Sequence, residues 1–148
     1  MYTKQKTARI AGNAATALYA LTIILQLLLA TGILPITMAW GGREPVLTTN
    51  LRIASLASAA LLVFLIYVIR RRAGLVRDAS ITPFIKVLSW LVTVFSALNF
   101  LGILVSLSSE EKILFGPISF LLLVACILVS LSKLEHQSAA SVENQAAL

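Results

Sequence analysis

Residues 87–109 read VLSWLVTVFSALNFLGILVSLSS, a run of 23 residues without a charged side chain between Lys86 and Glu110. A hydrocarbon core about 30 Å thick needs about 20 helical residues to cross it. Inside hydrocarbon the backbone must satisfy its own hydrogen bonds, and an uninterrupted apolar run does so only as a helix. The stretch therefore predicts one transmembrane helix.

Three other uncharged intervals flank this one, at residues 10–42, 53–69 and 113–132. Each interval is long enough for one crossing and too short for two. The whole chain of 148 residues is 59% hydrophobic and 12% charged, and a soluble domain has about twice that charged fraction. A transmembrane barrel is excluded because residues 61–69 are apolar throughout, without the alternation of a barrel strand.

The chain is therefore predicted to be an all-α polytopic membrane protein with an antiparallel four-helix transmembrane bundle. Short loops between successive spans favour the up-down-up-down arrangement. A single transmembrane domain is expected over residues 11–133, between an amino-terminal segment at 1–10 and a polar tail at 134–148. The expected spans cover residues 12–38, 50–70, 83–107 and 110–132.

Positive charges predict the orientation of the bundle. The amino terminus, the second loop and the carboxyl tail together hold nine of the twelve lysines and arginines. The opposite side holds Arg43, Arg52 and Lys112. Because short cytoplasmic loops are enriched in positive charge, both termini are expected in the cytoplasm, with the chain in the cytoplasmic membrane of a prokaryote.

Local signals predict where the helices begin and end. The first interval is too long for one straight helix, and Gly32 and Pro35 are expected to end or bend it.

Two further helices have recognisable starts. Thr82 is expected to cap the third helix, with Pro83 at its first position. Ser108 and Glu111 have the spacing of a capping box, so the fourth helix is expected to start there and to kink at Pro117.

Polar side chains inside the expected spans recur at helical spacing, so each set lies on one face of its helix. They are Tyr19, Thr22 and Gln26 in the first span, Ser89, Thr93, Ser96 and Asn99 in the third, and Ser119, Cys126 and Ser130 in the fourth. Relative to the span centres, a polar layer is expected near the bilayer midplane, formed by Gln26, Ser58, Ser96, Asn99 and Cys126.

Two interpretations of this polar layer stay open. The polar groups either bond across helix interfaces or line a pathway for a small solute, and the absence of charge within the spans favours packing. The small residues Ala54, Ser55, Ser58 and Ala59 form a candidate helix-association patch, used either within the bundle or against a second chain.

No residue pattern points to catalysis, to a metal or to a cofactor. The chain has one cysteine, and its one histidine, His136, lies in the polar tail. A serine nucleophile needs a general base, and the uncharged intervals at residues 10–42, 53–69, 87–109 and 113–132 contain no His, Asp or Glu. The chain is expected not to be an enzyme. A lipid-modifying enzyme would require Arg52, Glu110 and Glu111 to converge.

The second loop carries a basic cluster, a candidate contact for anionic lipid, formed by Arg70, Arg71, Arg72 and Arg77. Nucleic-acid binding is not expected because this short loop has no aromatic residue for stacking. The expected partners are the lipid bilayer and a homo-oligomer or a larger membrane protein. The leading hypothesis is an accessory or self-associating membrane component, and the alternative is a small channel or transporter.

Overall fold

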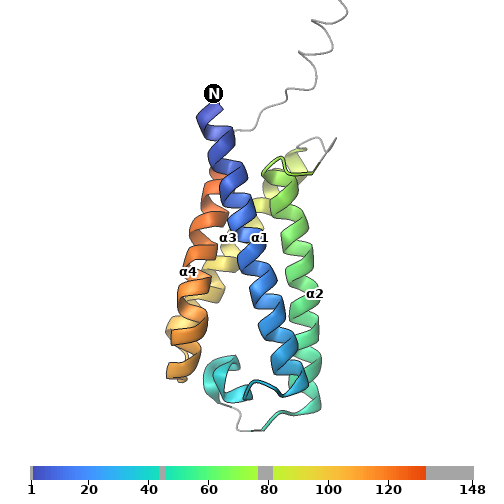
Figure 1. The fold of residues 1–148 in the computed structure, drawn as a ribbon, viewed down its shortest axis with the longest axis vertical. Helices are drawn as coiled ribbons and strands as arrows, with labels where there is room; N and C mark the ends of the chain where they lie inside the picture. The colour runs from blue at the N-terminus through green and yellow to red at the C-terminus, as the bar shows by residue number, and fades with distance from the viewer. Residues whose placement is uncertain (1, 44–45, 77–81, 133–148) are drawn as a thin grey trace, which may run out of the picture.

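The computed structural model describes residues 2–43, 46–76 and 82–132, with side chains from residue 5 onward (Figure 1). Its long helices are α1 (Tyr2–Thr31), α2 (Thr49–Arg72), α3 (Pro83–Leu104) and α4 (Ser109–Leu131). Two short 3-10 turns, η1 (Ile36–Met38) and η2 (Trp40–Gly42), follow α1. All four long helices are long and apolar enough to cross a membrane. The prediction of an all-helical chain with four candidate spans is confirmed.

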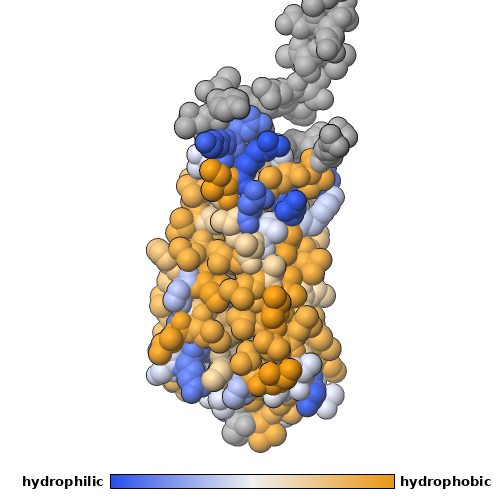
Figure 2. All heavy atoms as spheres, in the orientation of Figure 1, coloured by the Kyte–Doolittle hydropathy of each residue, from blue (hydrophilic) through white to orange (hydrophobic). Residues whose placement is uncertain are grey.

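The four helices pack as a bundle in which successive helices run in opposite directions (Figure 1). α1 packs closely on α2 and on α4, and α3 packs on α4, whereas α2 and α3 touch each other much less. Large apolar side chains cover the outside as a broad belt, with polar side chains at both ends of the molecule (Figure 2). This surface is suited to hydrocarbon, and the seam between α2 and α3 is the loosest part of the bundle.

The starts of α3 and α4 match the local signals in the sequence. The Thr82 hydroxyl accepts a hydrogen bond from the first turn of α3, and Pro83 is the first helical residue. The Ser108 hydroxyl accepts a hydrogen bond from the Glu111 N–H at 3.1 Å. Both predicted starts are confirmed, and α4 continues as one helix through Pro117.

The first helix ends at Thr31, earlier than the expected boundary at residue 38. Gly32 has a φ of 80°, and its N–H donates to the Leu29 carbonyl at 3.1 Å. The Ile33 N–H donates to the Leu28 carbonyl at 3.0 Å. These two bonds form a Schellman motif, which satisfies the last carbonyls of the helix and turns the chain away from its axis.

A buried carboxylate fixes the segment that follows α1. Glu111 accepts hydrogen bonds from the Gly41 N–H at 2.9 Å and from the Ser106 hydroxyl. The Leu107 N–H donates to the Gly41 carbonyl at 3.2 Å. The two turns η1 and η2 therefore fold back under the bundle, against the turn between α3 and α4 (Figure 1). We call this end the loop end, and the opposite end, which carries Arg9 and Arg72, the basic end.

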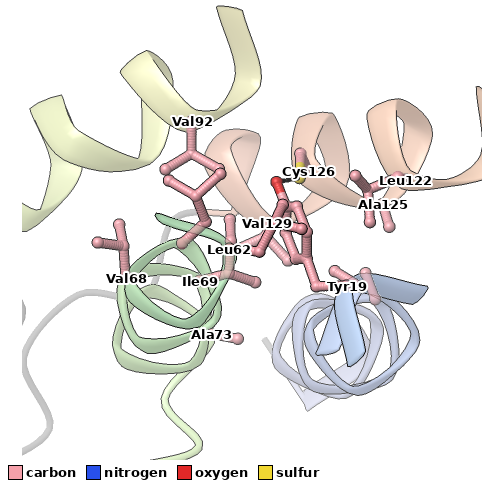
Figure 3. Packing of buried hydrophobic residues seen from close by; sticks show 13 residues of the cluster. Tyr19, Leu62, Val68, Ile69, Ala73, Val92, Leu122, Ala125, Cys126 and Val129 are labelled. Atoms are coloured by element: carbon pink, nitrogen blue, oxygen red, sulfur yellow. Dashed lines mark hydrogen bonds between the residues drawn. The ribbon is translucent and has the colours of Figure 1, made fainter. Parts of the chain in front are cut away.

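The interior contains two separate apolar clusters. The basic-end core joins all four helices around Tyr19, Leu62, Val92 and Cys126 (Figure 3). The loop-end core brings η1 and the turn after it together with α1, α3 and α4, and its members are Leu25, Leu29, Ile36, Ala39, Ile103 and Phe115. The candidate site lies between these two cores.

Candidate functional site

A cavity of about 90 Å³ lies between the two cores, and all four helices line it. Its apolar wall includes Leu62 and Leu122 from the basic-end core and Ile103 and Phe115 from the loop-end core. Its polar lining residues are Tyr19, Thr22, Gln26, Ser58, Ser96, Asn99 and Ser119. An ordered water needs about 10–15 Å³ of such space, so the cavity has room for several waters or for a small chemical group.

Some of the lining hydroxyls already donate their protons within the chain. Thr22 donates to the Leu18 carbonyl at 2.9 Å, and Ser119 donates to the Gly116 carbonyl at 3.0 Å. Each acceptor is a backbone group of the same helix, a common arrangement for hydroxyls inside helices. These two hydroxyls have no proton left to offer a ligand.

Tyr19 closes the cavity toward the basic end. Its hydroxyl lies 3.0 Å from Ser96 Oγ. The same hydroxyl lies 3.6 Å from Cys126 Sγ (Figure 3). Either hydroxyl can be the donor in the bond between Tyr19 and Ser96, and Ser96 Oγ also lies 2.9 Å from the Val92 carbonyl of its own helix. The three side chains tie α1 to α3 and α4 at full burial.

A second group of polar contacts lies beyond Tyr19, toward the basic end, and packs α3 against α4. Thr93 Oγ1 and Ser130 Oγ lie 2.9 Å apart, and both hydroxyls lie within hydrogen-bond distance of the Ser89 carbonyl. All three side chains are buried between α3 and α4. These bonds join the two helices.

Replacing Tyr19 by phenylalanine should destabilise the protein modestly. The change removes the hydroxyl that bonds to Ser96, and a hydrogen bond between membrane helices contributes about 0.6 kcal/mol on average and about 1.7 kcal/mol at most. We expect a loss of about 0.5–1.5 kcal/mol in unfolding measured in mixed micelles. Tyr67→Phe is the matched control, because Tyr67 is exposed and bonds only to Arg71 of its own helix. Equal losses in the two variants would contradict this assignment.

Three lining groups make no hydrogen bond within the described residues: the carboxamides of Gln26 and Asn99 and the hydroxyl of Ser58. Gln26 Oε1 is fully enclosed and still without a partner. An amide or hydroxyl without a partner in an apolar medium costs about 2–7 kcal/mol. Three polar groups that make no hydrogen bond in the described chain therefore line one cavity. The helix segments that carry them are apolar enough to lie in hydrocarbon.

We place the mouth of the cavity between α2 and α3, because its exposed lining residues lie on these two helices. Leu61 on α2 is 42% exposed and Phe95 on α3 is 40% exposed, although both line the cavity. Asn99 also lines it and is exposed. The other lining residues are buried or half-buried. The mouth therefore coincides with the loose seam between α2 and α3, and it faces the surface that is suited to hydrocarbon.

The five residues of the expected midplane layer lie close together, with one difference in position. Gln26, Ser58, Ser96 and Asn99 line the cavity. Cys126 does not line it, because its side chain lies behind Tyr19 and Ser96 in the basic-end core. Four residues of the expected layer thus line the cavity, and Cys126 packs in the core behind its wall.

The candidate association patch divides between two environments. Ser55 and Ala59 are buried within this chain, on a helix that packs mainly against α1. Ala54 and Ser58 are half-buried, and Ser58 lines the cavity. Half of the patch is therefore covered by the bundle itself.

The basic cluster also divides. Arg72 is 5% exposed and donates to the carbonyl oxygens of Ser130 and Ser132, where cations are stabilised by the carboxyl end of α4. Arg71 donates to the Tyr67 hydroxyl at 3.0 Å, and Arg70 is half-buried. Arg72 is thus engaged in the fold, so it does not face lipid as the sequence suggests. Arg77 and the tail at 134–148 lie outside the described residues.

The charged residues at the loop end contact different parts of the chain. Arg52 donates to the Ala30 carbonyl near the end of α1 at 3.2 Å, and Glu111 binds Gly41 and Ser106. Among the residues that the structure describes, no three His, Cys, Asp or Glu side chains gather as a metal site would require.

Tyr19, Thr22 and Ser119 are lining residues that were not placed in the midplane layer. Their signal was present in the sequence, because Tyr19 and Thr22 share the face of Gln26 at helical spacing. A tyrosine inside a span also needs a partner for its hydroxyl, which marks Tyr19 as part of a polar contact.

No family model, curated protein or solved structure matches this chain. The functional assignment therefore depends on the cavity and its chemistry.

Proposed function

We propose that the protein is an integral membrane protein that binds a small neutral molecule in the cavity between its helices. The molecule enters from the lipid phase, through the mouth between α2 and α3. The observation that carries this proposal is the convergence of Gln26, Ser58 and Asn99, all without hydrogen-bond partners in the described chain, on one cavity. A bound polar group would supply the bonds that the protein does not.

Binding from the bilayer is better supported than conduction across it. The cavity is bounded by Tyr19 and the basic-end core on one side and by Ile103 and Phe115 on the other. A channel needs a continuous polar path, and both cores interrupt it with apolar side chains. In place of the alternative hypothesis of a small-solute transporter, we therefore propose a binding protein whose ligand enters from the lipid phase between α2 and α3.

Self-association receives less support from the structure. Ser55 and Ala59, the more deeply buried half of the association patch, are covered within the chain. We keep the proposal that the chain is not an enzyme, because the described cavity lining offers hydroxyl and carboxamide groups and no acid or base.

The placement in the membrane is also a proposal. The nine-to-three bias of lysine and arginine supports both termini in the cytoplasm, with the chain in the cytoplasmic membrane of a prokaryote. The mouth between α2 and α3 then lies within the hydrocarbon, away from both aqueous phases.

Native mass spectrometry of the protein in nanodiscs tests the binding proposal. We expect the wild-type protein, extracted gently from its own membranes, to carry a small-molecule adduct. The double variant Gln26→Leu with Asn99→Leu should lose at least about 90% of it, because a buried polar group of the ligand would face two apolar side chains.

Thr22→Val is the matched control for this experiment. Thr22 lines the same cavity, but its hydroxyl is committed to the Leu18 carbonyl, so the variant should keep the adduct. A wild-type protein without any adduct, or equal loss in the control, would contradict the proposal.

A further inference from the structure

We infer that the bound molecule is a lipid-soluble alcohol, whose hydroxyl head occupies the cavity and whose apolar chain leaves between α2 and α3. This inference rests on the proposed function and adds the chemical class of the ligand. It follows from three properties of the site: the charge of its lining, the kind of hydrogen bond that its free groups need, and the position of its mouth.

The lining selects a neutral head. None of the lining side chains carries a charge. Arg52 and Arg72 lie near the two ends of α2, where Arg52 is held by the Ala30 carbonyl and Arg72 by the end of α4. A carboxylate, phosphate or ammonium in this cavity would be desolvated without a counter-charge, which is much more costly than burying a neutral group. Fatty acids, phospholipid heads and lipid amines are therefore disfavoured.

The uncommitted groups select a head that both donates and accepts. Gln26 and Asn99 each offer a carbonyl acceptor and an amide donor, and rotation about the last side-chain bond brings either atom toward the cavity. Ser58 adds one hydroxyl. A ligand hydroxyl donates one proton and accepts at its oxygen, so it serves an acceptor and a donor together. A ketone or an ether only accepts, and it would leave the carboxamide oxygens, Gln26 Oε1 among them, without a partner.

The size and the mouth of the cavity select an amphiphile with its chain outside. About 90 Å³ accommodates a head of a few heavy atoms and excludes a long chain. Leu61 and Phe95 stand at the mouth, both apolar and both exposed on the surface of the bundle. An apolar chain anchored at its hydroxyl would pass between them and lie along the surfaces of α2 and α3 among the lipid chains.

Photocrosslinking with four matched probes tests this inference on the full-length protein in nanodiscs. The probes share one long alkyl chain with a diazirine near the head and differ only in that head: alcohol, methyl ether, carboxylate or ammonium. We expect the alcohol to label segments 58–62 and 95–99, as mapped by peptide mass spectrometry. The ether should label them about tenfold less, which corresponds to the loss of one hydrogen bond of about 1.4 kcal/mol. The two charged probes should label them less still.

Variants separate specific binding from partition into lipid. Gln26→Leu should reduce alcohol labelling about tenfold, because it removes the enclosed acceptor Gln26 Oε1, and should reduce ether labelling less, because the ether makes no bond to that acceptor. Thr31→Val should alter neither probe, because Thr31 lies on the same helix outside the cavity lining and its hydroxyl bonds to carbonyls of α1.

The outcomes distinguish this inference from the proposed function. If the ether labels the cavity as strongly as the alcohol, the ligand class is wrong and the cavity remains a binding site. A charged probe that labels best would overturn the inference in the same way. If no probe labels these segments above the level of the remaining lipid-facing surface, both the inference and the proposed function fail.

Discussion

Replacing Glu111 by alanine is expected to lower the free energy of unfolding by about 2–4 kcal/mol, because hydrogen bonds to a charged group contribute about 1.5–3 kcal/mol each. The Glu111 carboxylate is buried and accepts from the Gly41 N–H and the Ser106 hydroxyl. Its loss leaves two donors without a partner and frees the turns η1 and η2 from the bundle. Reversible unfolding in mixed micelles measures the loss.

Two further variants define the cause of this effect. Glu110→Ala removes a carboxylate from the same first turn of α4, and Glu110 is exposed, so the change should be within about 0.5 kcal/mol. Glu111→Gln keeps one carbonyl oxygen as an acceptor for Gly41 and should lose about half as much as alanine. If Glu110→Ala is as harmful as Glu111→Ala, the effect belongs to the helix terminus and the assigned contact is wrong.

Replacing Gly42 by alanine is expected to cost about 2–4 kcal/mol, the sum of a strained backbone and an overpacked contact. Gly42 has a φ of +66°, which side-chain-bearing residues rarely adopt. An added Cβ would lie 2.6 Å from Ser108 Cβ and 3.1 Å from the Ser108 backbone nitrogen. Because Ser108 is the N-cap residue of α4, the clash would displace η2 or the cap of that helix.

Gly102→Ala is the control for this substitution. Gly102 lies inside α3, and an added Cβ would meet nothing within 4 Å. Alanine also favours the helix by about 1 kcal/mol over glycine, so this variant should be neutral or stabilising. Thermal unfolding of both variants in one detergent gives the comparison. A Gly42→Ala protein as stable as the wild type would contradict the close packing of η2 on α4.

The number and type of helices were predictable because the signals for them are local. An uncharged run such as residues 53–69 must be helical wherever it crosses hydrocarbon. The starts at Thr82 and Ser108 depend on bonds within one helical turn, so a few letters of sequence suffice for them. The end of α1 was less certain because Gly32 and Pro35 are both able to end a helix, and Gly32 does so first.

The site was predictable only in part because it depends on how the helices rotate against each other. Helical spacing places Tyr19 and Gln26 on one face, but it does not say that Tyr19 reaches Ser96 and Cys126. The bond between Glu111 and Gly41 joins the first turn of α4 to η2, 70 residues apart in the sequence, and no local pattern predicts it. Burial of Arg72 likewise follows from the position of the end of α4.

Solid-state NMR in lipid bilayers tests most directly whether the free carboxamides face a cavity that opens to lipid. The sample is perdeuterated protein with protonated lipid, back-exchanged at its amides, and the signals are the side-chain amide protons of Gln26 and Asn99. We expect both to show contacts with aliphatic protons of lipid or of a bound molecule and none with bulk water. Strong water contacts at both side chains, without aliphatic contacts, would show a water-filled cavity and contradict binding from the bilayer.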